Sequence, residues 1–222
     1  MRYSLIPSAR AAPHYGVLLV VLLILSVVGP AVHAETAGYG VEFFFDLVLV
    51  TGAYSAAWQS KHRLPFLALT VTTLVVRWTD MALDHTGFSL ISVVLVVAWL
   101  VYAVGLIMVA LFRMPDVNTN TILGAIVAFL LAAVAFSGVF ELIELLQPGA
   151  FSGLPASGLQ PDIEHALLYF SFVSITTMGY GDILPVSALA RSFASLEGVF
   201  GTLYLAVMIA RLVGLHSRRR DA

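Results

Sequence analysis

The chain has 222 residues, of which 60% are hydrophobic and 11% charged, and its formal net charge is −2. A mean hydropathy of +0.97 excludes a soluble globular domain and predicts an all-α integral membrane protein. The chain contains no cysteine, which excludes disulfides, thiolate nucleophiles and cysteine-ligated metals. The net charge by itself indicates no partner, so the positions of the charges must be considered instead.

Six apolar segments reach the length of about 20 residues that a helix needs to cross a hydrocarbon core of about 30 Å. In chain order they are 15–32, 41–58, 64–82, 88–112, 121–146 and 187–215. The first has an alternative interpretation, because Arg2 and Arg10, an apolar stretch and the run Ala31-Val32-His33-Ala34, which resembles a small-residue cleavage site, are typical of a cleaved signal peptide. We favour a retained helix, which gives an even number of spans.

Lysine and arginine residues predict the orientation of these segments. The connections 35–40, 83–87 and 147–161 contain neither residue type. The basic residues outside the spans all fall in the opposite connections or at the termini: Arg2, Arg10, Lys61, Arg63, Arg113, Arg218, Arg219 and Arg220. Since basic residues stay on the cytoplasmic side, both termini are expected in the cytoplasm of a cell with a bacterial-type inner membrane, as parts of a multi-pass cell-membrane protein.

Charged residues also occur within the second and third segments, on the side expected to face outward. They are Glu42, Asp46, Arg77, Asp80 and Asp84. Intramembrane charges must pair, so we expect an interhelical ion-pair cluster; a ligand-sensing or proton-sensing site and a voltage sensor are the alternatives. The segment 88–112 contains no Arg or Lys before Arg113, which argues against a voltage sensor.

The segment 162–176 is amphipathic and too short to span a membrane, and it leads into Thr176-Thr177-Met178-Gly179-Tyr180-Gly181-Asp182. This stretch resembles the filter of the tetrameric potassium-channel pore family, which reads Thr-Val-Gly-Tyr-Gly-Asp. The resemblance is tight over 162–214 and loose over 121–146. It implies a four-helix N-terminal membrane domain at 1–116 and a pore domain at 117–222, with a re-entrant pore helix and filter between the fifth and sixth transmembrane helices.

In that family the ions are coordinated by backbone carbonyls, which replace the hydration shell of K⁺. The resemblance assigns coordination to Thr177, Met178, Gly179, Tyr180 and Gly181. Glycine tolerates the unusual backbone angles that such a filter requires. Residues expected to support the filter are Tyr169, Val173, Thr176 and Asp182, with the Tyr169 hydroxyl offered to Asp182.

The segment departs from the family pattern in three ways. Met178 replaces a β-branched residue and so removes a source of stiffness, Val173 lacks a carboxylate found in some relatives, and Tyr169-Phe170 replaces a pair of tryptophans. In the last segment Gly201 is a candidate gating hinge or a site of close packing. Glu197 is expected either to pack behind the filter or to line the cavity.

The resemblance implies passive, potassium-selective conduction through a homotetramer embedded in membrane lipids, without strong voltage gating. We expect no enzymatic activity, no cofactor other than permeant K⁺, no nucleic-acid partner and no soluble ligand-binding domain. One alternative is a weakly selective cation channel, because of Met178. A less favoured one is a non-conducting or regulatory subunit of an ion transport system.

Overall fold

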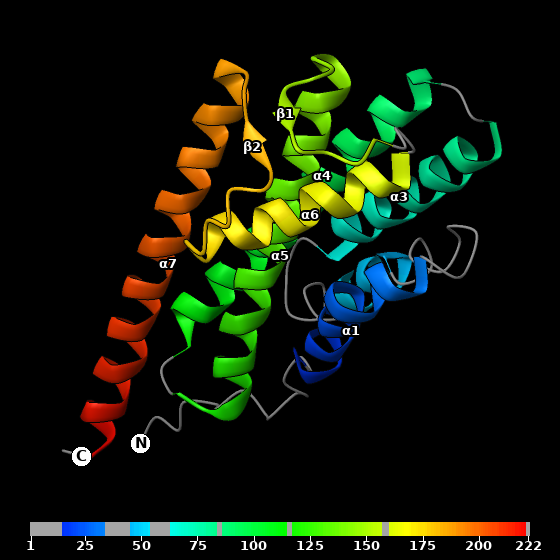
Figure 1. Ribbon diagram of the computed structural model, residues 1–222. Coiled ribbons are helices and arrows are strands. Elements are labelled where there is room, and N and C mark those ends of the chain that lie inside the picture. Colours follow the sequence, from blue (N-terminus) through cyan, green and yellow to red (C-terminus); the bar gives the residue numbers. More distant parts are fainter. Residues whose placement is uncertain are drawn as a thin grey trace.

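The computed structural model describes residues 15–33, 45–53, 63–83, 86–114, 117–156 and 160–220. Figure 1 shows a helical protein in which one long C-terminal helix stands beside the others. The helices are α1 (Tyr15–His33), α3 (Arg63–Leu83), α4 (Thr86–Arg113), α5 (Thr119–Leu146), α6 (Gln160–Ile175) and α7 (Ala188–Arg220), and residues 45–53 are also helical. Two short strands, β1 (Phe151–Ser152) and β2 (Leu184–Pro185), flank α6.

Within the described residues, three helices are long and apolar enough to cross a membrane. They are Ser89–Arg113, Thr119–Leu146 and Ala188–Gly214, which correspond to the fourth, fifth and sixth predicted spans. The first three predicted spans coincide with α1, the helical residues 45–53 and α3. In the part of the chain whose side chains the structure describes, none of these meets the same criteria, and Tyr15–Ile24 of α1 is a shorter apolar helix. The helical, multi-pass architecture is therefore confirmed, whereas the number of six spans stays a prediction.

Helix α5 lies at the centre of the fold and packs against α1, α4, α6 and α7. Small residues on α5 permit this, because a Cβ on Gly124 would lie 2.8 Å from the Tyr15 ring and one on Gly138 would lie 2.7 Å from Val97. These two glycines therefore let α1 and α4 approach α5 closely. Asn118 caps α5, as its side chain accepts a hydrogen bond from the Thr121 N–H at 2.8 Å.

Helix α7 is fixed to the rest of the fold by polar contacts at its C-terminal half. The Tyr204 hydroxyl donates to the Ala125 carbonyl of α5 at 2.6 Å. Further along, Arg211 donates to the carbonyls of Leu111 at 2.8 Å and Met114 at 3.1 Å, where α4 ends. The Leu111 carbonyl also accepts the Met114 N–H at 3.3 Å. Carbonyls in the last turn of a helix keep acceptor capacity that the helix itself does not use, so a guanidinium is well suited to bind them.

At the opposite end, the segments before and after α6 meet. Strand β1 pairs antiparallel with β2, with Phe151 opposite Pro185, and the Ala150 carbonyl accepts the Val186 N–H at 2.8 Å. Edge-to-face contacts among Phe140, Phe151 and Phe170 fill the space beneath this pair. The chain therefore leaves β1, runs through α6 and returns to β2 at the same end of the molecule (Figure 1).

Candidate functional site

Helix α6 runs obliquely between α5 and α7, and the chain after it turns back alongside α7 toward β2 (Figure 1). Its buried side chains, Leu167 and Phe170, belong to the same apolar cluster as Phe140 of α5. Ile175, the last residue of α6, is fully buried against Ala132 and Ala133 of α5. These contacts fix the C-terminal end of α6 and hence the starting point of the loop 176–182.

The backbone of this loop alternates in conformation. The angle φ is +58° at Thr177, +60° at Gly179 and +79° at Gly181, whereas it is not positive at Met178 or Tyr180. A positive φ is accessible to glycine but is a strained conformation for a β-branched residue such as Thr177. Glycine fits this conformation at positions 179 and 181, so the backbone strain in the loop falls on Thr177.

The N–H groups of the loop show which way its carbonyls point. The N–H groups of Met178 and Gly179 both donate to the Val173 carbonyl of α6, at 2.9 and 3.3 Å. No peptide bond in the described chain is cis, and a trans peptide directs its C=O opposite to its N–H. The carbonyls of Thr177 and Met178, which share peptide groups with these N–H groups, therefore point away from α6.

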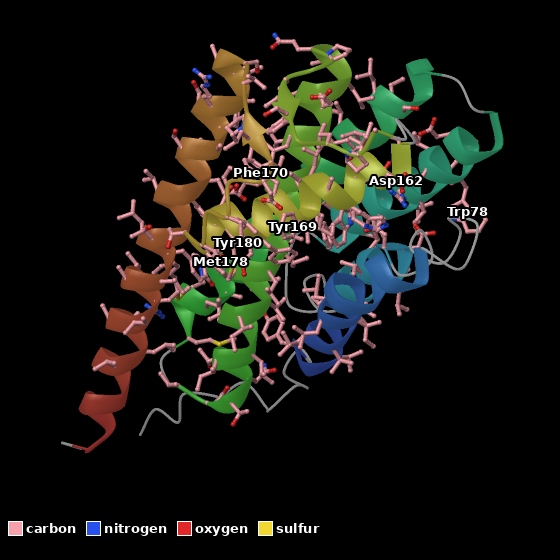
Figure 2. The ribbon with its side chains drawn as sticks, viewed as in Figure 1. Trp78, Asp162, Tyr169, Phe170, Met178 and Tyr180 are labelled. Carbon is pink, nitrogen blue, oxygen red and sulfur yellow. The ribbon has the colours of Figure 1, made fainter. Side chains whose placement is uncertain are left out.

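Tyr169 of α6 and Tyr180 of the loop stand together (Figure 2). The Tyr180 ring stacks on the Tyr169 ring, with centroids 6.4 Å apart and planes within 12°. A hydrogen bond with the Asp182 carboxylate is the largest cause that raises the pKa of Tyr169 above its ordinary value. The predicted contact between Tyr169 and Asp182 is thus confirmed, while its role in supporting a filter stays a prediction.

The other residues proposed as filter support, Val173 and Thr176, make hydrogen bonds within α6 and to the loop that follows it. Val173 is buried and contributes the carbonyl described above. The Thr176 hydroxyl donates to the Phe172 carbonyl at 2.6 Å, so it closes the last turn of α6. Met178 and Tyr180 retain exposed side-chain fractions of 56% and 66% in the single chain.

Helix α7 contributes two residues behind α6. Glu197 is fully buried and is hydrogen-bonded to Ser171 of α6, so it packs behind the loop rather than lining a cavity. A Cβ on Gly201 would collide with the Ile175 carbonyl, so this glycine permits close packing of α7 on the end of α6. Its proposed role as a hinge stays a prediction, because α7 is helical throughout.

Two charged side chains bind backbone groups near the β1–β2 pair. Arg191 donates to the Pro185 carbonyl at 3.1 Å, which anchors the start of α7 to β2. The Glu144 carboxylate accepts the N–H groups of Gly149 at 2.7 Å and Phe151 at 3.1 Å. The sequence could not reveal these contacts, because the partners are backbone groups that folding brings close.

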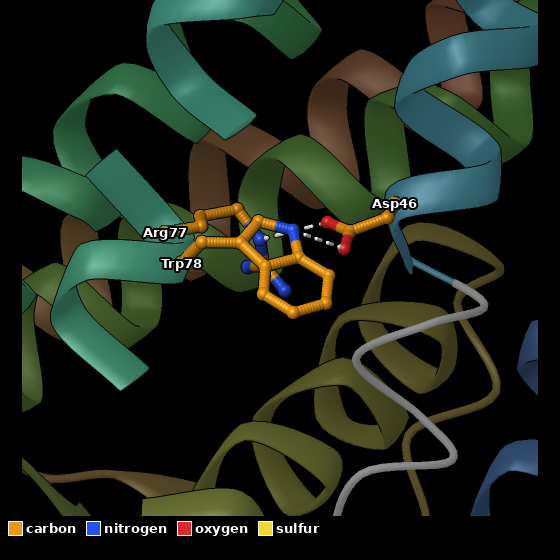
Figure 3. Close-up of polar contacts among 3 residues, drawn as sticks. All are labelled: Asp46, Arg77 and Trp78. Atoms are coloured by element: carbon orange, nitrogen blue, oxygen red, sulfur yellow. Dashed lines mark hydrogen bonds and ion pairs between the residues drawn. The ribbon is translucent and has the colours of Figure 1, made fainter. Parts of the chain in front are cut away.

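The charged residues of the N-terminal half form an ion pair (Figure 3). Arg77 Nε lies 3.3 Å from Asp46 Oδ1, and Trp78 Nε1 donates to Asp46 Oδ2 at 3.1 Å. The Arg77 guanidinium also lies over the Phe45 ring, 4.6 Å from its centroid. The predicted ion pair is thus confirmed with Asp46.

Asp80, the other partner considered for Arg77, accepts a hydrogen bond from Ser89 at 3.1 Å. Glu42 and Asp84, the remaining members of the predicted cluster, lie outside the described residues. The structure therefore supports an interhelical ion pair in this region, and the sensing alternatives stay predictions.

Comparison with known proteins identifies the C-terminal part of the chain. Residues 162–217 match the family model described as ion channel, so the resemblance read from the filter segment is confirmed over α6, the loop and most of α7. No curated protein and no solved structure matches the chain significantly. Together with the three apolar helices, the match indicates a multi-pass membrane protein that carries an ion-channel domain and functions in ion transport.

Proposed function

We propose that the chain is one subunit of a homotetrameric, potassium-selective channel, with the carbonyls of residues 177–181 as its filter. The observation that carries this proposal is the alternating φ of the loop, together with the N–H groups of Met178 and Gly179 that converge on the Val173 carbonyl. Successive carbonyls on one side of a strand are what a dehydrated K⁺ requires, because they replace its water shell.

One chain supplies one such strand, and a ring of carbonyls around an ion requires four. A four-fold axis beside the loop is therefore the arrangement we propose. The exposed side chains of Met178 and Tyr180 and the exposed apolar residues of α7, such as Leu203, would then meet neighbouring subunits or lipid. The strain at Thr177 fits a functional site, where such conformations are commonly found.

We further propose that α6 and the loop form a re-entrant segment that opens to the outside, within a six-span topology with both termini in the cytoplasm. The pairing of β1 with β2 supports this, since it returns the chain to the end at which α6 begins. The cysteine-free sequence makes the test direct. In intact cells a membrane-impermeant thiol reagent should label Ala156→Cys but not Thr119→Cys, and the reverse pattern would refute the orientation.

Ion flux from liposomes tests the proposed function itself. Purified protein should release K⁺ but not Na⁺ from loaded vesicles, with block by barium, and native mass spectrometry should detect a tetramer. The alternative of a weakly selective channel rests on Met178, which is exposed and lacks a β-branch. Comparable Na⁺ flux that falls in Met178→Val would favour that alternative, and absence of any flux from a folded tetramer would contradict both.

A further inference from the structure

One polar junction lies buried between α5, α6 and α7. The Ser171 hydroxyl of α6 lies 2.6 Å from the Ala133 carbonyl of α5, and it is also hydrogen-bonded to Oε1 of Glu197 on α7. Both side chains are fully buried. The second carboxyl oxygen of Glu197, Oε2, has no hydrogen-bond partner in the described part of the chain.

The number of protons at this junction determines the state of Glu197. A serine hydroxyl carries one proton, a backbone carbonyl carries none, and an ionised carboxylate carries none. If Glu197 were ionised, two acceptors would share the single Ser171 proton, and the charge on Oε2 would remain without a donor. Within the described residues no basic side chain forms an ion pair with Glu197, and a buried, uncompensated carboxylate is strongly unfavourable.

A carboxylic acid removes both difficulties, because its O–H can donate to the Ser171 oxygen while the Ser171 proton goes to the Ala133 carbonyl. We propose that Glu197 is held protonated in the folded channel and that this buried hydrogen-bond chain, from Glu197 through Ser171 to Ala133, positions α6 for conduction. The positioning role rests on the proposed channel function, whereas the protonation state does not.

The position of the junction explains why it would matter for the filter. Ser171 precedes Val173 by two residues, and the Val173 carbonyl binds the N–H groups of Met178 and Gly179. One turn beyond Glu197, Gly201 packs against the Ile175 carbonyl at the end of α6. A shift of α6 along its axis would therefore displace the Val173 carbonyl and change the direction of the loop carbonyls.

Infrared spectroscopy tests the protonation state without any ion flux. The difference spectrum of wild-type protein minus Glu197→Gln at neutral pH should contain the C=O stretch of a protonated carboxylic acid, and that band should shift in Ser171→Ala. The matched control is Glu141→Gln on α5, whose difference spectrum should lack the band. A carboxylate band instead of an acid band for Glu197 would refute the proposal.

Potassium flux per folded tetramer tests the positioning role. Glu197→Gln retains a hydrogen-bond donor for Ser171 and should keep flux near the wild-type level. Glu197→Leu and Ser171→Ala should each lower flux by about tenfold, which is the effect expected for losing a buried hydrogen bond. Their combination should fall no further than the worse single variant.

Wild-type flux in a folded Glu197→Leu tetramer would overturn the positioning role. If Glu197→Leu does not assemble, wild-type flux in Ser171→Ala would overturn it. Loss of flux in Glu197→Gln equal to that in Glu197→Leu would overturn it too. Failure of the wild-type protein to conduct would contradict the proposed function alone, since the infrared result stands independently.

Discussion

Replacement of Gly179 by alanine gives the sharpest test of the loop geometry. The glycine has φ of +60°, and a Cβ built on it meets no atom within 4 Å. Alanine would therefore not clash within its own subunit, and the whole cost arises from the left-handed backbone. That cost is about 1–2 kcal/mol per residue, or about 4–8 kcal/mol for four copies around one pore.

We expect Gly179→Ala to fold and assemble as the wild-type protein does but to lose potassium-selective flux, because the loop relaxes to a negative φ. Thermal unfolding and size-exclusion profiles measure the first property, and paired K⁺ and Na⁺ liposome assays measure the second. Gly105→Ala is the matched control, since its Cβ also meets open space but its backbone is helical, where alanine is favourable. Unchanged K⁺ selectivity in a folded Gly179→Ala tetramer would refute the assignment of this loop as a filter.

Three further predictions concern the charged side chains. Arg77→Met should lower the free energy of unfolding by about 3 kcal/mol, which is near the low end for a buried pair because each side chain retains 16% exposure. Adding Asp46→Leu should restore much of the loss, and altered gating at normal stability would contradict this prediction. Arg211→Met should loosen α7 from the end of α4, which faster hydrogen exchange at 111–114 would report, and unchanged exchange would refute the contact's importance. Opening of the channel should depend little on voltage. If Arg77 crossed the whole membrane field in all four subunits, the coupling would be about 9 kcal/mol per 100 mV, but an Asp46 that moves with it cancels the charge. A steep rise in open probability between about −100 and +100 mV would contradict this interpretation.

Much of this protein could be predicted from local sequence patterns. Continuous apolar segments predicted the helices, because the length and hydropathy of such a segment depend on nothing beyond the segment itself. The filter segment was recognisable for a similar reason, because its glycines permit backbone angles that other residues adopt only with strain. The match to the ion-channel family likewise lies within one continuous segment, residues 162–217. The Arg77–Asp46 pair followed from the rule that charges within a membrane need partners.

Other features could be decided only by the tertiary structure, because their partners are backbone groups brought together by folding. No pattern in the sequence indicates that Val173 supplies the carbonyl for Met178 and Gly179, or that Arg211 binds the end of α4. Glu197 is the clearest case. A lone glutamate in an apolar helix is compatible with a cavity or with a packed interior, and only the placement of Ser171 and Ala133 around it shows a buried carboxyl behind the loop.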